Sequence, residues 1–311
     1  MTDPPPSVFR GAAGYLYTQK GTETMAQLLK GAPVAAALNE KTSSLAEALR
    51  AKGVPPVLAI VRVGARTDDL SYERGAMKRA KELGISVRHA VFPATVDNGT
   101  FCRYLDALGA DPTVHGILLF RPLPKTLDEA EAIRHIVPAK DVDGCTAGSL
   151  AGVFLNEPLG FAPCTAQAAM EILAHYGIDL SGKRAVVIGR SPVVGRPAAM
   201  LLMHRNATVT ICHTRTKDVP SLTREADIVI ACSGQIDTLG AEYFAPGQTV
   251  IDVGIGWSDR LNKLCGDVRF DEVEPSVGAI TPVPGGVGSV TTAVLMHHVV
   301  LAAEKAAFLE A

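Results

Sequence analysis

The sequence lacks a strong excess of charge, a long apolar run and any closely spaced pair of cysteines. Its 30 Lys and Arg residues face 32 Asp and Glu residues, and the formal net charge of -2 argues against a protein that coats nucleic acid. No uninterrupted apolar run reaches the roughly 18 residues that a membrane span needs. With 47% hydrophobic and 20% charged residues among 311, the composition is that of a soluble globular protein of about two domains.

The cysteines and histidines form no metal-ligand pattern. The six cysteines are Cys102, Cys145, Cys164, Cys212, Cys232 and Cys265. No two of them have a C-x-x-C spacing, which predicts reduced, buried thiols in a cytoplasmic protein rather than a structural zinc site. His297 and His298 are adjacent, so on a helix they would point in different directions. We therefore predict that the chain has no metal site.

Residues 1–24 do not resemble part of a domain. They begin with a polar, proline-rich stretch and show no clear periodicity. No basic segment followed by an apolar stretch is present, so they are not expected to be a secretory signal. We expect a disordered tail that precedes the first domain.

From Met25 onward, strand-like and helix-like segments alternate. Residues 56–63 form a continuous apolar run between Pro55 and Gly64, which is typical of a strand buried on both faces. Further strands are predicted at residues 87–92 and 116–120, and helices at residues 26–52, 69–83, 98–108 and 127–136. Such alternation predicts a parallel sheet with helices on both faces.

A second run of the same kind follows. Strands are predicted at residues 185–188, 208–212, 226–231 and 249–253, and helices at residues 166–176, 197–204 and 290–309. The last helix is long enough to return to the first half of the chain. We therefore predict an α/β protein of two domains, the first formed by residues 25–147 with helix 290–309 and the second by residues 148–289.

A glycine turn follows the first strand of the second domain. In the stretch Val187-Ile-Gly-Arg-Ser-Pro-Val-Val-Gly-Arg-Pro197, Gly189 ends the strand and Gly195 lets the backbone approach closely. The free N–H groups at the start of the next helix suit a pyrophosphate. The spacing departs from the usual G-x-G-x-x-G, so a plain strand–helix turn is an alternative.

The end of the second strand in this domain indicates which dinucleotide binds. NAD enzymes place a carboxylate there to hold the ribose hydroxyls. Here the strand is followed by His213-Thr-Arg-Thr-Lys217, and no carboxylate occurs before Asp218. Hydroxyls and cations suit a 2′-phosphate, with which Arg190 could form a forked pair, so we predict NADP rather than NAD. A solvated basic loop is the alternative.

Several stretches together resemble the methylenetetrahydrofolate dehydrogenase/cyclohydrolase family of folate one-carbon metabolism. They are Lys140-Asp-Val-Asp-Gly144, Pro163-Cys-Thr165, the glycine turn, Cys212-His-Thr-Arg-Thr216, Gly266-Asp-Val268 and Thr281-Pro-Val-Pro-Gly-Gly-Val-Gly288. The resemblance implies an N-terminal folate-binding domain and a Rossmann-like NADP-binding domain, with the folate cleft between them. It also implies tetrahydrofolate derivatives as substrates and a homodimer formed through the cofactor domains.

The resemblance also implies roles for individual residues. Tyr72 matches the tyrosine that stacks on the folate, and Asp143 matches the aspartate that hydrogen-bonds the pterin amino edge; both are expected to be catalytic and substrate-binding residues. Asp141 is expected to be structural. The loop residues expected to close over the ligands and bind substrate are Pro284, Gly285 and Gly286, followed by Val287. The cofactor-binding residues expected are Gly189, Arg190, Ser191, Gly195, His213, Thr214 and Ile255.

Three positions of the expected cleft depart from the family pattern. The family has a lysine four residues after the tyrosine, where this chain has Ala76. The glutamine that accompanies the lysine is replaced by Phe120, and a serine three residues before the tyrosine is replaced by Asp69. In the family, this lysine is the key group of the cyclohydrolase step.

These departures affect the two reactions of the family differently. Hydride transfer from methylenetetrahydrofolate needs no side chain that gives or takes a proton, whereas hydrolysis of the methenyl cation needs proton transfer. We therefore predict an NADP-dependent dehydrogenase whose cyclohydrolase step is in doubt. One alternative is that both activities persist because Arg74, Lys78 or Arg121 reaches the site. Another is a non-catalytic folate- or nucleotide-binding protein.

Overall fold

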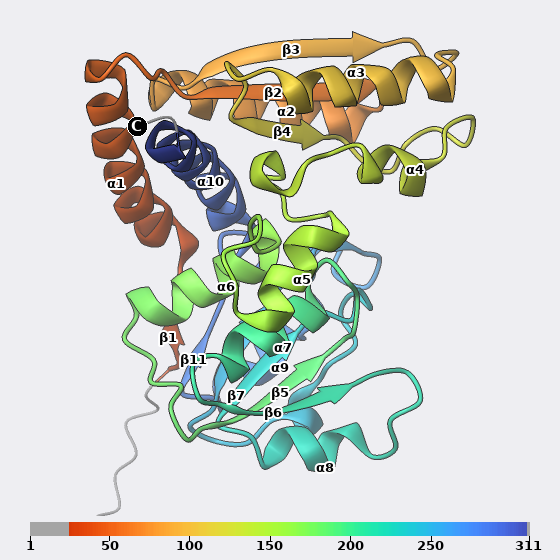
Figure 1. Cartoon of the computed structure of the whole chain (residues 1–311). Helices are drawn as coiled ribbons and strands as arrows, with labels where there is room; N and C mark the ends of the chain where they lie inside the picture. The colour runs from red at the N-terminus through yellow and green to blue at the C-terminus, as the bar shows by residue number, and fades with distance from the viewer. Residues whose placement is uncertain (1–24, 310–311) are drawn as a thin grey trace, which may run out of the picture.

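The strands of the protein form two separate parallel sheets and one small antiparallel hairpin (Figure 1). The computed structural model describes residues 25–309; the expected tail at residues 1–24 lies outside the described residues. Within residues 25–309 no helix is long and apolar enough to cross a membrane.

The smaller sheet has three strands in the order β3-β2-β4. These are β2 (Val57–Val63), β3 (Ser86–Phe92) and β4 (Gly116–Leu119), and all pair in parallel. β2 is the central strand and is buried at every position after the first, as its apolar sequence predicts. Alternate residues of β2 pack on opposite faces of the sheet, so it has helices on both sides.

Different helices cover the two faces of the smaller sheet. On one face Val61 packs with residues of α3 (Asn98–Ala110) and α4 (Glu129–Arg134). On the other, Ile60 belongs to an apolar cluster with α2 (Thr67–Glu82) and with helices nearer the second sheet. This second face therefore links the two halves of the molecule.

The larger sheet has six parallel strands in the order β1-β11-β8-β7-β5-β6. They are β1 (Gln27–Leu28), β5 (Arg184–Ile188), β6 (Thr208–Cys212), β7 (Ile228–Ala231), β8 (Thr249–Asp252) and β11 (Ala279–Ile280). The helices between them are α6 (Cys164–His175), α7 (Gly195–Met203), α8 (Val219–Arg224) and α9 (Phe270–Val273). β5 lies between β6 and β7, so the strand order reverses there, which is where doubly wound sheets bind ligands.

The start of the chain differs from the prediction of one helix over residues 26–52. Residues 27–28 form β1, which pairs with β11, and helix α1 begins only at Gly31 and runs to Ala51. Leu29 is fully buried, and its N–H donates to Ile280 O at 2.8 Å. The first described residues therefore extend the larger sheet, although the predicted boundary assigned them to the first domain.

Several short elements were not predicted. They are the helices α5 (Ala147–Leu155), α8 and α9, the antiparallel strands β9 (Gly256–Ser258) and β10 (Lys263–Cys265), the strand β11, and the 3-10 turns η1 (Pro138–Lys140) and η2 (Ala241–Tyr243). The predicted helix and strand ends otherwise differ from the observed ends by a few residues. Short elements have too few residues to show a clear period.

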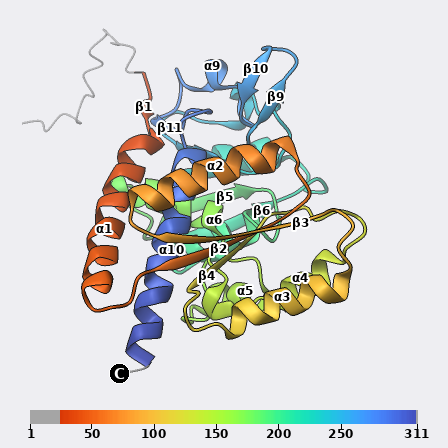
Figure 2. The same ribbon diagram turned by 90° about the horizontal axis from the view of Figure 1, so that it is seen from above.

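The last helix, α10 (Gly288–Leu309), returns to the first half of the chain as predicted. It packs along α1 and also against α6 and α2, and Figure 2 shows α1 and α10 side by side. Its buried residues include Val290, Leu295 and Val299, which belong to the cluster below the smaller sheet. The helix therefore holds the two sheets together.

Candidate active site

Tyr72, on α2, presents a partly exposed aromatic ring beside the end of β4. The side chain is 39% exposed, and its ring meets that of Phe120 edge to face with centroids 5.7 Å apart. Burial around the Tyr72 hydroxyl raises its pKa, and the nearby Cys164 and Asp143 raise it further. A hydrogen bond with Thr292, near the start of α10, opposes this rise. Tyr72 thus lies near both Asp143 and the first turns of α10.

Asp143 forms an ion pair with Arg121. The Arg121 Nη2 atom lies 3.2 Å from Asp143 Oδ2, and both side chains are partly buried. Burial raises the pKa of Asp143, while the Arg121 guanidinium lowers it. Arg121 directly follows Phe120, so one chain segment supplies both the aromatic neighbour of Tyr72 and the cation beside Asp143.

Asp141 has a different environment from Asp143. It is fully buried and accepts hydrogen bonds from the backbone N–H groups of Cys145 at 3.0 Å and Thr146 at 2.7 Å. These contacts close the turn before α5, which agrees with the structural role expected from the sequence.

Ala76 lies one helical turn after Tyr72, but its methyl group does not face open solvent. Ala76 is 1% exposed and Phe120 is 7% exposed, and both belong to the same apolar cluster. The methyl group of Ala76 is thus packed among apolar side chains. Asp69, at the third departing position, is also buried.

Of the three basic residues that could replace the family lysine, only Arg121 contacts Asp143. The Lys78 side chain is 80% exposed and lies 4.0 Å from Glu82. Arg74 is exposed as well. Since α2 carries both residues on its outer side, neither is placed to act beside Tyr72.

The predicted closing loop lines a cavity of about 230 Å³ at the carboxyl ends of β8 and β11. Its lining includes Pro284, Gly285 and Gly286 from the loop, and Ile255 from the segment before β9. Gly285 has a φ of +104°, which side-chain-bearing residues rarely adopt. The Gly31 N–H donates to Gly285 O at 2.8 Å, so the start of α1 supports the loop.

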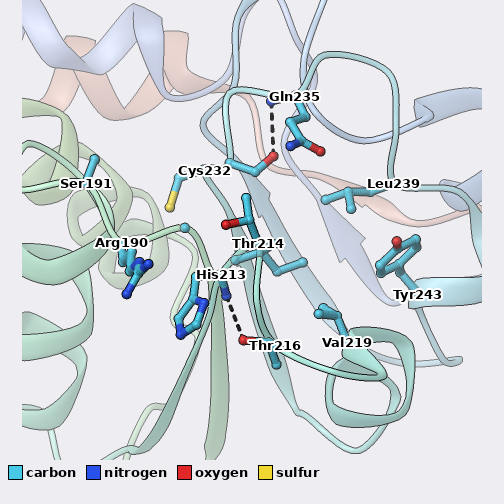
Figure 3. A pocket seen from close by; sticks show the side chains of 13 residues that line it. Arg190, Ser191, His213, Thr214, Thr216, Val219, Cys232, Gln235, Leu239 and Tyr243 are labelled. Carbon is cyan, nitrogen blue, oxygen red and sulfur yellow. Dashed lines mark hydrogen bonds between the residues drawn. The ribbon is translucent and has the colours of Figure 1, made fainter.

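A second cavity, of about 370 Å³, lies at the carboxyl ends of β5, β6 and β7 (Figure 3). Five of the predicted cofactor residues line it: Gly189, Arg190, Ser191, His213 and Thr214. Figure 3 shows Arg190, Ser191 and His213 on one side and Leu239 and Tyr243 on the other. No Asp or Glu is found among the described residues that line this cavity, so its polar side suits an anionic group.

Two predicted cofactor residues lie outside that lining. Gly195 begins α7, where a Cβ atom would lie 2.3 Å from Gly189 O, so glycine there allows the turn to close. Ile255 instead lines the cavity formed with the closing loop. The glycine turn and Ile255 are therefore not brought together in a single cavity.

Sequence reasoning did not name the rest of this lining as cofactor residues, although Thr216 lies in the stretch that favoured NADP. The additional residues are Ile188, Thr216, Val219, Cys232, Ser233, Gln235, Leu239 and Tyr243. The segment from Cys232 to Gln235 directly follows β7, so the rule that ligands bind at the carboxyl ends of parallel strands could have identified it. Tyr243 lies in a short 3-10 turn that gives no such signal.

Buried carboxylates hold the loops between the two cavities. Asp267 Oδ2 accepts from the N–H groups of Ser233 at 2.6 Å and Gly234 at 3.0 Å. Asp252 Oδ1 accepts from the N–H groups of Asp267 at 3.0 Å and Gly254 at 3.1 Å. Burial raises the pKa of Asp252 to about 7. These two carboxylates join the loops that follow β7 and β8.

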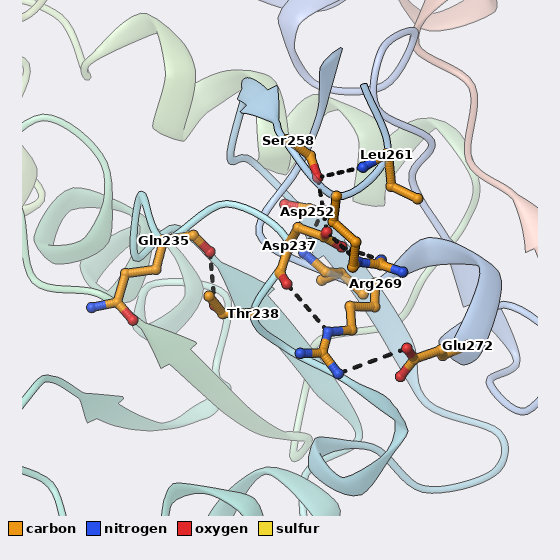
Figure 4. Close-up of polar contacts among 10 residues, drawn as sticks. Gln235, Asp237, Thr238, Asp252, Ser258, Leu261, Arg269 and Glu272 are labelled. Atoms are coloured by element: carbon orange, nitrogen blue, oxygen red, sulfur yellow. Dashed lines mark hydrogen bonds and ion pairs between the residues drawn. The ribbon is translucent and has the colours of Figure 1, made fainter. Parts of the chain in front are cut away.

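The β9–β10 hairpin is anchored by a separate polar cluster (Figure 4). Asp237 Oδ2 accepts from Ser258 Oγ at 2.9 Å and from Arg260 Nε at 2.6 Å, and the Asp237 carbonyl accepts from Arg269 Nε at 3.2 Å. Arg260 lowers the pKa of Asp237. Because Ile255 directly precedes β9, this cluster fixes one wall of the smaller cavity.

Most of the chain is similar to one family of folate enzymes. The family model described as tetrahydrofolate dehydrogenase/cyclohydrolase, catalytic domain, matches residues 29–143, and that described as the NAD(P)-binding domain matches residues 163–307. The bifunctional protein FolD of Carboxydothermus hydrogenoformans is 53% identical over 282 residues, which cover 90% of this chain and 98% of that protein. FolD of Alkaliphilus oremlandii is 46% identical over 89% of this chain and 97% of that protein.

Solved structures give the same result. The bifunctional FolD methylenetetrahydrofolate dehydrogenase/cyclohydrolase of Campylobacter jejuni has a TM-score of 0.87 and 36% identity, over 90% of this chain and 99% of that one. The Trypanosoma brucei enzyme complexed with NADP and an inhibitor has a TM-score of 0.84 and 32% identity, over 91% and 99%. Two family models that together match most of the chain, and relatives matched over nearly their full length, show that the chain belongs to the tetrahydrofolate dehydrogenase/cyclohydrolase family.

Proposed function

We propose that this protein oxidises 5,10-methylenetetrahydrofolate to 5,10-methenyltetrahydrofolate with NADP. The observation that carries this proposal is the pairing of two sites in a chain of this family. The first site consists of Tyr72, Arg121 and Asp143, beside the start of α10. The second is the cavity that Arg190 lines, in which no Asp or Glu is found among the described lining residues. The closing loop lines a cavity of its own and leads directly into α10.

The residues of the first site fit the folate. The partly exposed ring of Tyr72 offers an aromatic face for the flat part of the substrate at low cost in entropy. The Asp143 carboxylate can accept two hydrogen bonds from an aminopyrimidine edge, which is a charge-assisted contact. We assign substrate binding and positioning to these two residues and to Pro284, Gly285 and Gly286.

The residues of the second site fit NADP. Arg190, His213 and Thr214 offer a cation, an imidazole and a hydroxyl for a phosphate, and Leu239 and Tyr243 offer apolar surface for a base. The cofactor supplies a hydride acceptor when it is bound. The protein then has to align the reacting carbon of the folate, because no side chain needs to move a proton in this step.

The cyclohydrolase step is proposed to be slow or lost. Hydrolysis of the methenyl product requires a water that loses a proton and a group that assists ring opening. The buried methyl of Ala76 and the ring of Phe120 can do neither. The guanidinium of Arg121 is paired with Asp143 and, because arginine stays protonated, cannot act as a base.

One assay tests both parts of the proposal. Reduction of NADP and absorbance of methenyltetrahydrofolate are followed separately after methylenetetrahydrofolate is added. We expect methenyltetrahydrofolate to accumulate in step with the reduced cofactor and to decay at the buffer rate. No reduction of NADP would refute the dehydrogenase proposal, whereas rapid loss of methenyltetrahydrofolate would show that both activities are present.

The assembly and the domain roles are proposed on separate grounds. We assign folate binding to residues 29–147 with residues 290–309 of α10, and NADP binding to residues 148–289. Four large apolar side chains are exposed on α5, on the loop after it and on α7; they are Phe154, Leu155, Leu159 and Met203. This apolar surface supports a homodimer formed through the cofactor domain. The free thiols support a cytoplasmic location. Light scattering of the purified protein tests the dimer, and a monomer would refute it.

A further inference from the structure

His298, on α10, makes a buried contact with the segment that carries Asp143. The side chain is 6% exposed, and its Nδ1 atom lies 2.9 Å from the carbonyl oxygen of Val142. A carbonyl oxygen can only accept, so Nδ1 carries the hydrogen in this contact. Burial lowers the pKa of His298 to about 4, and the ring is therefore neutral near pH 7.

The same carbonyl has a second donor from another helix. The thiol of Cys164, the first residue of α6, donates to Val142 O at 3.2 Å, and its sulfur lies 3.7 Å from His298 Nδ1. Burial raises the pKa of this thiol, so it keeps its hydrogen. Two helices therefore fix one peptide group directly before Asp143.

The remaining neighbours leave this segment little room to move. The ring of Phe161 stacks on that of His298 with centroids 4.7 Å apart and an interplanar angle of 28°. On the other side of Asp143, a Cβ atom at Gly144 would lie 2.7 Å from Phe161 O. The turn from Val142 to Gly144 is therefore held between α10 and the chain that leads into α6.

We propose that His298 is a positioning residue for Asp143. By donating to Val142 O, it fixes the direction in which the Asp143 carboxylate leaves the backbone, beside Arg121 and toward Tyr72. The effect is on folate affinity and not on NADP affinity, because none of these contacts reaches the NADP cavity. The inference rests on the proposed role of Asp143 in folate binding.

The test compares His298→Leu with His297→Leu. Leucine keeps apolar bulk at position 298 but removes the donor, whereas the His297 ring lies 3.0 Å from Thr42 Oγ1 on α1 and away from Val142. His298→Leu should raise the KM for methylenetetrahydrofolate about ten-fold, the size expected for one lost buried hydrogen bond, and leave the KM for NADP unchanged. His297→Leu should change neither KM, and His298→Asn, which can still donate, should recover part of the folate affinity.

A double-mutant cycle separates this inference from the proposed function. In an Asp143→Asn background, His298→Leu should have little further effect on the folate KM, since both changes act through one carboxylate. An unchanged folate KM in His298→Leu, or equal rises in both KM values, would overturn the inference. If Asp143→Asn itself leaves the folate KM unchanged, it is the proposed role of Asp143 that fails. Should His298→Leu not fold, His298→Phe keeps an aromatic ring that can stack on Phe161 and removes the donor, and an unchanged folate KM there would equally overturn the inference.

Discussion

The ring of Tyr72 meets the ring of Phe120 edge to face, with 5.7 Å between centroids and 71° between ring planes. Ala76, one helical turn after Tyr72, is buried in the same apolar cluster as Phe120. The proposed folate site is thus apolar at the two positions where the family pattern has a lysine and a glutamine. At these two positions, the proposed site therefore offers no side chain that can take a proton from water.

The first prediction concerns the choice between NADP and NAD. Arg190→Ala should raise the KM for NADP about ten- to a hundred-fold and the KM for NAD much less, because a charge-assisted hydrogen bond contributes roughly 1.5–3 kcal/mol. Steady-state kinetics with each cofactor checks this. Arg205→Ala removes an exposed arginine outside the cavity and is the matched control. Equal effects on both cofactors would contradict the assignment.

The second prediction separates the two aspartates near the folate site. Asp143→Ala should weaken folate binding and leave NADP binding nearly intact, since separate sets of residues hold the two ligands. Asp141→Asn should instead lower thermal stability, because Asp141 accepts hydrogen bonds from two buried backbone N–H groups. Calorimetric titration and thermal unfolding distinguish the two effects. A variant of Asp143 with normal folate affinity but reduced stability would show that it is only structural.

A large part of the fold could be predicted from local patterns. Residues 57–63 form a strand because an apolar run fits a position buried on both faces, and Gly189 ends its strand where the φ of +133° requires glycine. The two-residue β1 was missed, since its structure depends on pairing with β11 at the far end of the chain. The adjacent His297 and His298 were expected to point apart, and they contact α1 and Val142 respectively. Which partner each one meets follows only from the packing of α10.

The third prediction is a pH effect of the Arg121–Asp143 pair. Burial raises the pKa of Asp143, and the guanidinium of Arg121 acts against this rise. Arg121→Leu should therefore raise the pKa further, so that the carboxylate is protonated at a higher pH than in the unchanged protein. In the pH profile of kcat/KM for the folate, the acid limb should move to higher pH. The acid limb of the profile for NADP should stay where it is. An acid limb that stays in place would show that the ion pair does not control Asp143.

The last prediction is that hydrolysis can be restored only by changing Ala76 and Phe120 together. Ala76→Lys alone places a long cationic side chain against an apolar ring with no polar partner, and burial without a partner is costly. Phe120→Gln alone supplies an amide but no group that can take a proton. The double variant supplies both at neighbouring positions, and general acid–base assistance typically contributes about 10²- to 10⁴-fold in rate. The rate of methenyltetrahydrofolate loss above buffer should therefore rise far more in the double variant than the two single effects combined. Lys78→Ala is the control, since Lys78 is exposed beside Glu82 and should affect neither reaction. If the double variant hydrolyses no faster than the unchanged protein while it still reduces NADP, the missing lysine and glutamine do not explain the proposed loss of hydrolysis.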